Sequence, residues 1–424
     1  MARPMRRRLP PALHNRDFAL FTVAIFASSL AQQMVMVAIG WQVYAIHRKP
    51  IDLALIGLAE FVPIPLLALP AGQLADRLPR TLITAASFVG SGVVTALLLV
   101  VSLGGAHQLW PFLALAAGTG ITTAAGAPAA RALVPQLVPV GELASALALR
   151  SVASQIAGVS GPALGGLLFA AGSEVVYGAG TGLFALSFLG VALMRRSGIP
   201  ATRVGDPAPG LRSVLLGIRF IRDTRILLGA ISLDLFAVLF GGSVALLPLF
   251  ARSILHTGPI GLGVLRSATA VGALVGGIQL TRRPIGPQAG RKLLLVVGAF
   301  GVCMVTFGLS RWFPLSFAAL AVSGYVDMFS MNIRSTIVAL ATPNALLGRV
   351  NAVEGVFISA SNELGAFESG LAAALIGAVP AVAIGGAITI TLALVWGRLF
   401  PPLAQVDRLE DVRPVEVPAA VAVL

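Results

Sequence analysis

The sequence predicts an all-α membrane protein with twelve transmembrane helices. Three observations support this: the composition, the spacing of the apolar runs and the distribution of basic residues. Of the 424 residues, 57% are hydrophobic and 11% are charged, and the mean hydropathy is +0.92. Soluble domains have about 25% charged residues, so this chain lacks the charge to cover a water-facing surface. We therefore expect a lipid bilayer to surround most of it.

The apolar residues occur in runs of roughly twenty, the length that a helix needs to cross about 30 Å of hydrocarbon. Helices are favoured because each closes its own backbone hydrogen bonds, whereas the short alternating strands of a membrane β-barrel are absent from the pattern. The expected spans are 18–46, 53–74, 82–103, 110–130, 143–170, 175–194, 226–254, 260–280, 293–309, 313–333, 350–376 and 379–399. The first run resembles a signal peptide, but it is too long for one, and we interpret it as the first permanent span.

The basic residues predict the orientation of these spans. Of the 30 Lys and Arg residues, 25 lie on one side of the predicted membrane. The other side has Arg48, Lys49, Arg252, Arg266 and Arg311. The positive-inside rule places the basic side in the cytoplasm, so both termini are expected there, in a bacterial-type inner membrane.

The net charge of +13 is distributed over short loops and forms no soluble basic domain, so binding to nucleic acid is not expected. The single cysteine, Cys303, excludes a disulfide framework and a cysteine-based metal site. It lies in an apolar run, where a small core residue is favoured over a redox role.

The longest polar stretch between spans divides the chain into two halves of six spans. We expect an N-terminal six-helix bundle at 1–194, a cytoplasmic central loop at 195–225, a C-terminal bundle at 226–399 and a cytoplasmic tail at 400–424. The second part of the central loop alternates apolar and basic residues at helical spacing, which indicates an interfacial helix; a polar linker without fixed structure is the alternative. The segments 139–143 and 343–347 occupy equivalent positions in the halves, as parallel repeats would.

Residues 72–80 read GQLADRLPR between the second and third spans. A carboxylate flanked by guanidinium groups can bind a helix terminus in one state and release it in another. The segment resembles the loop signature of the major facilitator superfamily, with a proline at position 79 and a threonine at position 81 as departures. The resemblance implies a cytoplasmic latch between the halves, formed by Gly72, Asp76, Arg77 and Arg80. The alternative is an aspartate that only caps the next helix.

The fifth span contains a second motif, AGVSGPALGG at residues 157–166. It is similar to the antiporter motif of the same superfamily, with alanine in place of the first glycine. Small residues let helices approach closely and proline bends them. The motif residues are Ala157, Gly161, Pro162, Gly165 and Gly166. The resemblance implies packing at the interface between the halves, although generic helix packing would use the same residues.

Further segments, at 15–18, 134–139 and 342–351, resemble the branch of the superfamily that contains the enterobactin exporter and macrolide or multidrug efflux proteins. The resemblance covers nearly the whole chain to about residue 399 and implies export. One departure concerns the energy source. Many proton-coupled drug exporters have an arginine within the fourth span, but here the span 110–130 has none before Arg131 at its end.

Ionisable residues inside spans cost roughly 2.5–3.5 kcal/mol on insertion scales, and they are functional candidates by default. Asp234 lies near the middle of the seventh span, which lines the cavity in the fold that the resemblance implies. It is the first candidate for a proton or a cationic substrate. The other candidates are Glu60, Glu363, Asp327 and Gln33. For the acids, a structural role in bonding neighbouring helices remains the alternative.

A second group of charges lies toward the predicted cytoplasmic ends and is expected to form a gate. Its members beyond the loop motif are Arg131, Arg334, Arg349 and Glu354. Asp327 and Arg334 are seven residues apart on one helical face, too far for direct contact, so each should pair elsewhere. Glu354 is expected to pair with Arg349 or with the loop at 72–80.

These features favour a secondary-active exporter that moves a small amphipathic molecule, a siderophore-like metabolite or a drug, by alternating access with proton antiport. Its partners would be this substrate, protons and the lipid bilayer, and we expect a monomer without a cofactor or a metal. An importer with the same fold and a non-transporting sensor are the alternatives. An enzyme is not expected because the four histidines are isolated, and no nucleotide-binding loop of the type GxxxxGK[ST] is present.

Overall fold

The computed structural model describes residues 15–105, 108–195 and 211–415. The side chains of residues 68, 69, 72, 73, 75, 76, 140, 211–214, 344 and 345 are outside this description. Within the described ranges, all regular secondary structure is helical. The chain forms two compact units.

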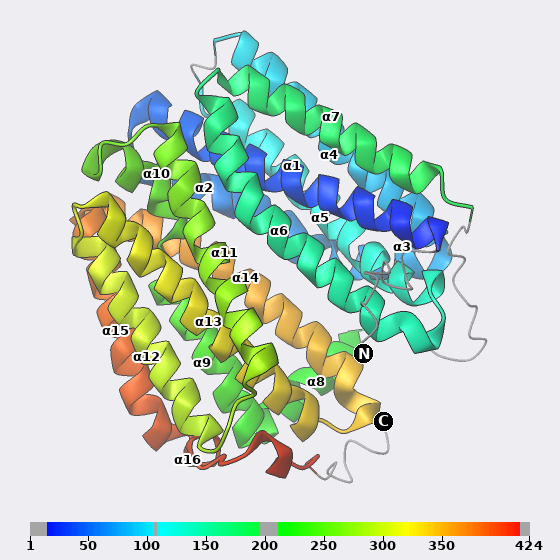
Figure 1. Cartoon of the computed structure of the whole chain (residues 1–424), viewed down its shortest axis with the longest axis vertical. Coiled ribbons are helices and arrows are strands. Elements are labelled where there is room, and N and C mark those ends of the chain that lie inside the picture. Colours follow the sequence, from blue (N-terminus) through cyan, green and yellow to red (C-terminus); the bar gives the residue numbers. More distant parts are fainter. Residues whose placement is uncertain (1–14, 106–107, 196–210, 416–424) are drawn as a thin grey trace, which may run out of the picture. The chain divides into compact units, whose positions relative to one another are not determined.

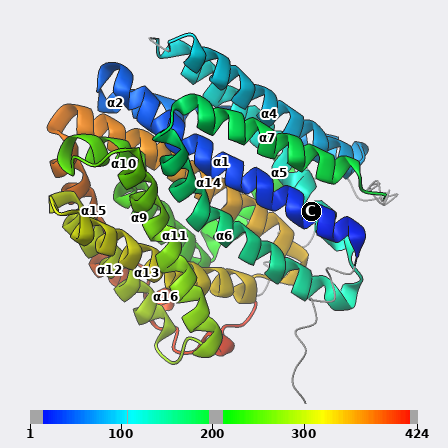
Figure 2. The ribbon, with the colours of Figure 1, turned by 45° about the horizontal axis from the view of Figure 1, so that its top comes forward.

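The first unit comprises the chain up to Gln42 and residues 62–206. Its helices are α1 (Arg16–His47, through Gln42), α3 (Pro63–Arg77), α4 (Arg80–Leu103), α5 (Trp110–Leu137), α6 (Leu143–Phe169) and α7 (Ser173–Ala192). Helix α4 packs against α5 and α7, and α1 lies between α6 and α7 in both views of the chain (Figures 1 and 2).

The second unit comprises residues 43–61 and the chain from Pro207 onward. Its helices are α2 (Pro50–Phe61), α8 (Leu211–Asp223), α9 (Arg225–Gly241), α10 (Leu247–Leu249), α11 (Pro259–Arg282), α12 (Ala289–Leu309), α13 (Phe313–Ala341), α14 (Asn344–Ile376), α15 (Ala378–Leu399) and α16 (Pro401–Ala404). Helix α2 packs on α14, and α12 runs beside α15 (Figure 1).

Eleven of the described helical segments are long and apolar enough to cross a membrane, which confirms the all-helical membrane architecture. The twelfth expected span, 350–376, lies in α14. This helix has 33 residues, enough to cross, but its acidic residues Glu354, Glu363 and Glu368 make it less apolar. The second expected span is divided at Val62, because Pro63 has no N–H for a hydrogen bond to the preceding turn.

Glycine at helix contacts explains how the apolar helices pack. A Cβ added at Gly301 of α12 would lie 2.7 Å from the carbonyl oxygen of Gly386 in α15, and the converse distance is also 2.7 Å. Only hydrogen at these positions allows the two backbones to approach so closely. Membrane helices commonly associate in this way, because lipid provides no hydrophobic driving force between them.

The amphipathic segment after residue 210 forms the helix α8, as its spacing predicts. Phe220 and Ile221 are buried against Leu346, Val350 and Val353 of α14. Part of its apolar face is therefore covered by protein within the second unit, whereas Leu215 and Ile218 are exposed. Residues 196–210 of the expected central loop lie outside the described part of the chain, and the expected division into bundles, loop and tail stays a prediction.

Candidate functional site

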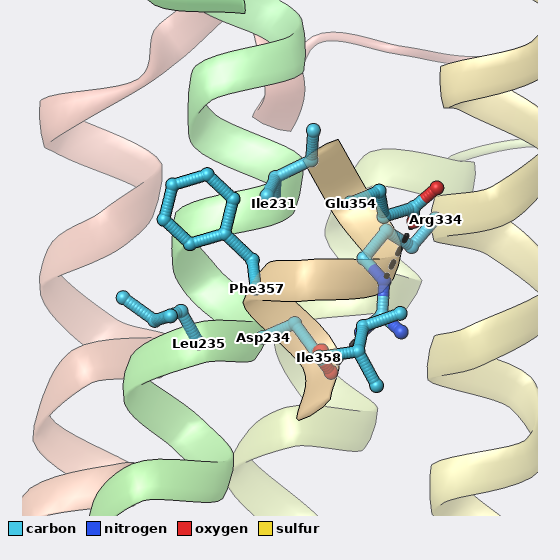
Figure 3. Close-up of a pocket in the computed structure, with 7 residues that line it drawn as sticks. All are labelled: Ile231, Asp234, Leu235, Arg334, Glu354, Phe357 and Ile358. Carbon is cyan, nitrogen blue, oxygen red and sulfur yellow. Dashed lines mark ion pairs between the residues drawn. The ribbon is translucent and has the colours of Figure 1, made fainter. Parts of the chain in front are cut away.

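A network of one buried and two largely buried charges lies in the second unit and connects α9, α13 and α14. Nη1 of Arg334 forms an ion pair with Oδ1 of Asp234, and Nε of Arg334 lies 3.7 Å from Oε1 of Glu354 (Figure 3). The exposed fraction of the side chain is 6% for Arg334, 11% for Asp234 and 13% for Glu354. The single guanidinium is therefore held between two carboxylates inside the helical core.

Aliphatic packing on both sides positions these charges. Asp234 is the tenth residue of α9, about 14 Å along the helix at 1.5 Å per residue. Next to it, Leu233 is buried in a cluster with Ile333 and Ile337 of α13, so α9 and α13 present their polar residues side by side. Because the surroundings are apolar, the two acids are the charged partners that Arg334 meets.

The network lines a pocket with an apolar opposite side. Figure 3 shows the three charged side chains at one side of the pocket, and Phe357 and Leu235 at the other. The ion pairs leave no room for a ligand between these side chains. A molecule could enter only if the ion pairs separate and the helices move apart.

Asp234 also borders a second cavity, of about 20 Å³, together with Asp327 and Ser330 of α13. That volume is enough for one water molecule. Asp327 is exposed, and it lies two helical turns before Arg334 on α13. Asp234 thus lies between the guanidinium on one side and, on the other, a small and mostly apolar cavity that Ala237, Val238 and Phe300 also line.

The structure corrects one expected pairing and agrees with another. Glu354 pairs with Arg334 of α13 and not with Arg349. Arg349 is five residues before Glu354 on α14, and neighbours on one helix face are three or four residues apart. Arg334 does find its partners away from Asp327, on α9 and α14. The ion pair between Asp234 and Arg334, 100 residues apart, was not foreseen from the sequence.

A second charged cluster in the same unit joins Glu60 of α2, Arg266 of α11 and Glu363 of α14. The carboxylate of Glu60 interacts electrostatically with Glu363 and with Arg266, and Glu363 interacts with Arg266. The sequence indicates both glutamates as candidates, whereas Arg266 is expected among the loop cations. The available signal was its position in the apolar run 260–280, well inside α11.

The antiporter-like motif lies on α6, and its five residues are buried. A Cβ at Gly161 would lie 2.6 Å from Cβ of Gln33, and a Cβ at Gly165 would lie 2.8 Å from Cα of Met34. The motif thus gives α1 and α6 a close contact within the first unit, with Gln33 half-buried at this contact. Its expected role at an interface between the halves stays a prediction.

The loop motif is described in part, because the side chains of Gly72 and Asp76 lie outside the description. Arg77 ends α3 with an exposed side chain, and Nη1 of Arg80 donates to the carbonyl oxygen of Ala132 in α5 at 2.8 Å. This bond anchors the start of α4 to α5. Arg131 is exposed on α5, and Arg349 is half-buried near the start of α14.

Comparisons with known proteins agree with this architecture. A family described as transmembrane secretion effector matches residues 9–420. The enterobactin exporter of Citrobacter koseri is 27% identical over 350 residues, 80% of either chain. That of Escherichia coli O1:K1 is 27% identical over 349 residues, again 80% of either chain.

Solved structures share the fold at low sequence identity. A point mutant of the nucleoside transporter NupG superposes with a TM-score of 0.73 at 11% identity, covering 91% of this chain and 100% of its own. A bacterial homologue of the human lysosomal transporter Spinster, in an inward-facing and occupied conformation, gives 0.69 at 15% identity, covering 96% and 99%. At these sequence identities the structural similarity shows the fold alone.

Proposed function

Since the chain belongs to the transmembrane secretion effector family, within the major facilitator superfamily, we propose that this multi-pass transporter exports a small amphipathic molecule by alternating access. Proton antiport supplies the energy in this proposal. The relatives named as enterobactin exporters favour a catecholate siderophore or a compound of similar chemistry, with a lipophilic drug as the other substrate class.

The observation that most supports the proposal is the placement of Arg334 between Asp234 and Glu354 in the helical core. Buried ion pairs contribute little net stability, because removing two charges from water is costly. Ionisable residues at membrane depth therefore indicate function. The pocket beside them combines a cation, two acids and the aromatic ring of Phe357.

The chemistry of such a network suits an exchange of protons for substrate. A substrate that donates hydrogen bonds through hydroxyl groups can displace Arg334 from the ionised carboxylate of Asp234, while Phe357 contacts its apolar part. A proton that binds this carboxylate cancels its charge and displaces the substrate. Release of the proton restores the ionised carboxylate, so proton and substrate occupy Asp234 in turn.

We further propose a monomer in a bacterial inner membrane with both termini in the cytoplasm, on the basis of the 25 to 5 distribution of basic residues. In this arrangement the loop at 72–80, with Arg131 and Arg349, latches the halves on the cytoplasmic side. The two six-helix halves rock about a central site, as in other transporters built from parallel repeats.

The proposal is tested in inside-out membrane vesicles with an acidic lumen, by following the uptake of catecholate siderophores and lipophilic dyes. The wild type should accumulate at least one compound, and Asp234→Asn should lose the accumulation. Exchange of labelled for unlabelled compound without a gradient should persist in this variant.

Asp223→Asn is the matched control. It makes the same chemical change at an exposed aspartate of α8, whose contact with Arg219 is 3.8 Å long, and such surface pairs contribute little. It should transport like the wild type. If the inserted wild type accumulates none of these compounds, export of them is wrong. If Asp234→Asn accumulates them normally, Asp234 is not the proton carrier.

A further inference from the structure

The cluster of Glu60, Arg266 and Glu363 has no part in the exchange just described. Its members come from three helices of the second unit: α2, α11 and α14. The other ionisable groups on the helices packed around them fall into two sets. One is the network of Asp234, Asp327, Arg334 and Glu354, and the other comprises Asp52, Arg225, Arg252, Arg282, Tyr325, Arg349, Glu368, Arg398 and the charged face of α8. The groups that act on Glu60 are Glu363 and Arg266.

The two glutamates meet where α2 and α14 are in close contact. A Cβ at Gly57 would lie 3.5 Å from Oε2 of Glu363 and 3.4 Å from Cβ of Ala366. Glu60 is three residues after Gly57, and residues three apart share a helix face. The carboxyl groups of Glu60 and Glu363 therefore lie along the same strip of the helix contact.

The contact continues one turn further along each helix. A Cβ at Gly370 of α14 would lie 3.1 Å from Cα of Ala54 and 3.2 Å from its nitrogen. Backbone meets backbone here, so no layer of water separates α2 from α14 at this end of the contact. The side chains of Glu60, Arg266 and Glu363 are half-buried, so the protein provides part of the balance for their charges.

The charges do not balance when all three groups are ionised. Two carboxylates and one guanidinium sum to −1, and an uncompensated charge in a low-dielectric setting is strongly disfavoured. Two carboxyl groups close together resolve this by keeping one proton. With one proton bound the cluster is neutral, and α2 can remain packed on α14. Loss of the proton leaves a net negative charge that favours separation and hydration.

We propose that Glu60 and Glu363 form a proton-binding site in which the two carboxyls share one proton beside Arg266, and that its occupancy controls the packing of α2 on α14. As a coupling site this inference rests on the proposed function. As a proton site it is independent of that function, because binding and release of the proton need only a carboxylate oxygen and water.

Infrared difference spectroscopy of the purified full-length protein tests the proton site without any substrate. The wild type should show the carbonyl band of one protonated carboxyl that shifts in D2O. Glu60→Gln and Glu363→Gln should each lose this band, because a single remaining carboxylate pairs with the guanidinium. Glu60→Asp should keep it. Glu174→Gln, at the start of α7, is the matched control and should leave it unchanged.

If both glutamine variants keep the band, the shared proton does not exist and the inference is overturned. Folding is monitored by the helical circular dichroism of each variant. Glutamine and glutamate have nearly the same shape, so each of the two glutamine variants is expected to fold. Glu60→Asp is a third variant that tests the site.

Transport separates the coupling role from the proton site. In the vesicle assay, Glu60→Gln and Glu363→Gln should lose gradient-driven accumulation and keep exchange of labelled for unlabelled compound. Normal accumulation together with loss of the band would refute the coupling role. If no compound is transported even by the wild type, export of these compounds fails, while the infrared result still decides the proton site.

Discussion

Replacing Gly165 by alanine should weaken the contact between α1 and α6, and the structure gives the size of the effect. The added Cβ would lie 2.8 Å from Cα and 2.9 Å from the carbonyl oxygen of Met34, whereas ordinary Cβ contacts begin at 3.4 Å. The obstacle is backbone, so relief requires that the helices move apart. Overpacking of this kind costs about 1–3 kcal/mol.

The same substitution also has a favourable component. Alanine exceeds glycine in helix propensity by about 0.8–1.0 kcal/mol. The expected net effect is therefore a loss of about 1 kcal/mol in the free energy of unfolding. It can be measured by titrating the protein in mixed micelles with sodium dodecyl sulfate and following the helical circular dichroism.

Gly182→Ala is the matched control, because it changes glycine to alanine in a helix of the same unit. A Cβ at Gly182 meets nothing within 4 Å, so only the propensity gain remains and the protein should be as stable as the wild type or slightly more so. If Gly165→Ala is as stable as Gly182→Ala, α1 and α6 are not in the close contact described.

Three further changes have expected outcomes. Arg334→Met should lower the free energy of unfolding by about 3 kcal/mol, because removing one member of a buried ionic network leaves its partners uncompensated; a loss below about 1 kcal/mol would contradict the network. Gly370→Val should cost about 1–3 kcal/mol through overpacking against α2, whereas Gly355→Val on the same helix meets nothing within 4 Å and should cost less; equal costs would refute the contact. Tyr177→Phe should cost about 1–2 kcal/mol, because the buried hydroxyl donates to Oε1 of Gln42 at 2.8 Å; unchanged stability in the same titration would argue against this bond.

Much of the fold could be predicted from the sequence, because crossing a bilayer requires long apolar helices and little else. The expected spans coincide with α-helices to within a few residues at most ends. The interruption at Val62 was missed, although Pro63 and Pro65 lie within the expected second span. Whether a proline bends, breaks or begins a helix depends on which neighbours satisfy the freed backbone groups.

The candidate site was predictable as a set of residues but not as a set of contacts. Asp234, Arg334 and Glu354 stood out because charge is rare in apolar runs. Their mutual pairing depends on how α9, α13 and α14 cross. The spacing of side chains along a single helix gives no information about such crossings. Arg266 is absent from the expected site for a different reason: it is expected in a loop, although its position in an apolar run indicates a charge inside a helix.

The lone thiol described above has a practical consequence for following motion. Cys303 is 8% exposed on α12, and the sequence contains no other cysteine. A single substitution of Cys303 by alanine or serine therefore gives a protein without cysteine. Spin labels or fluorophores can then be attached at chosen pairs of positions. Distances between them, recorded in acid and in alkali, would reveal alternating access directly as the transporter cycles.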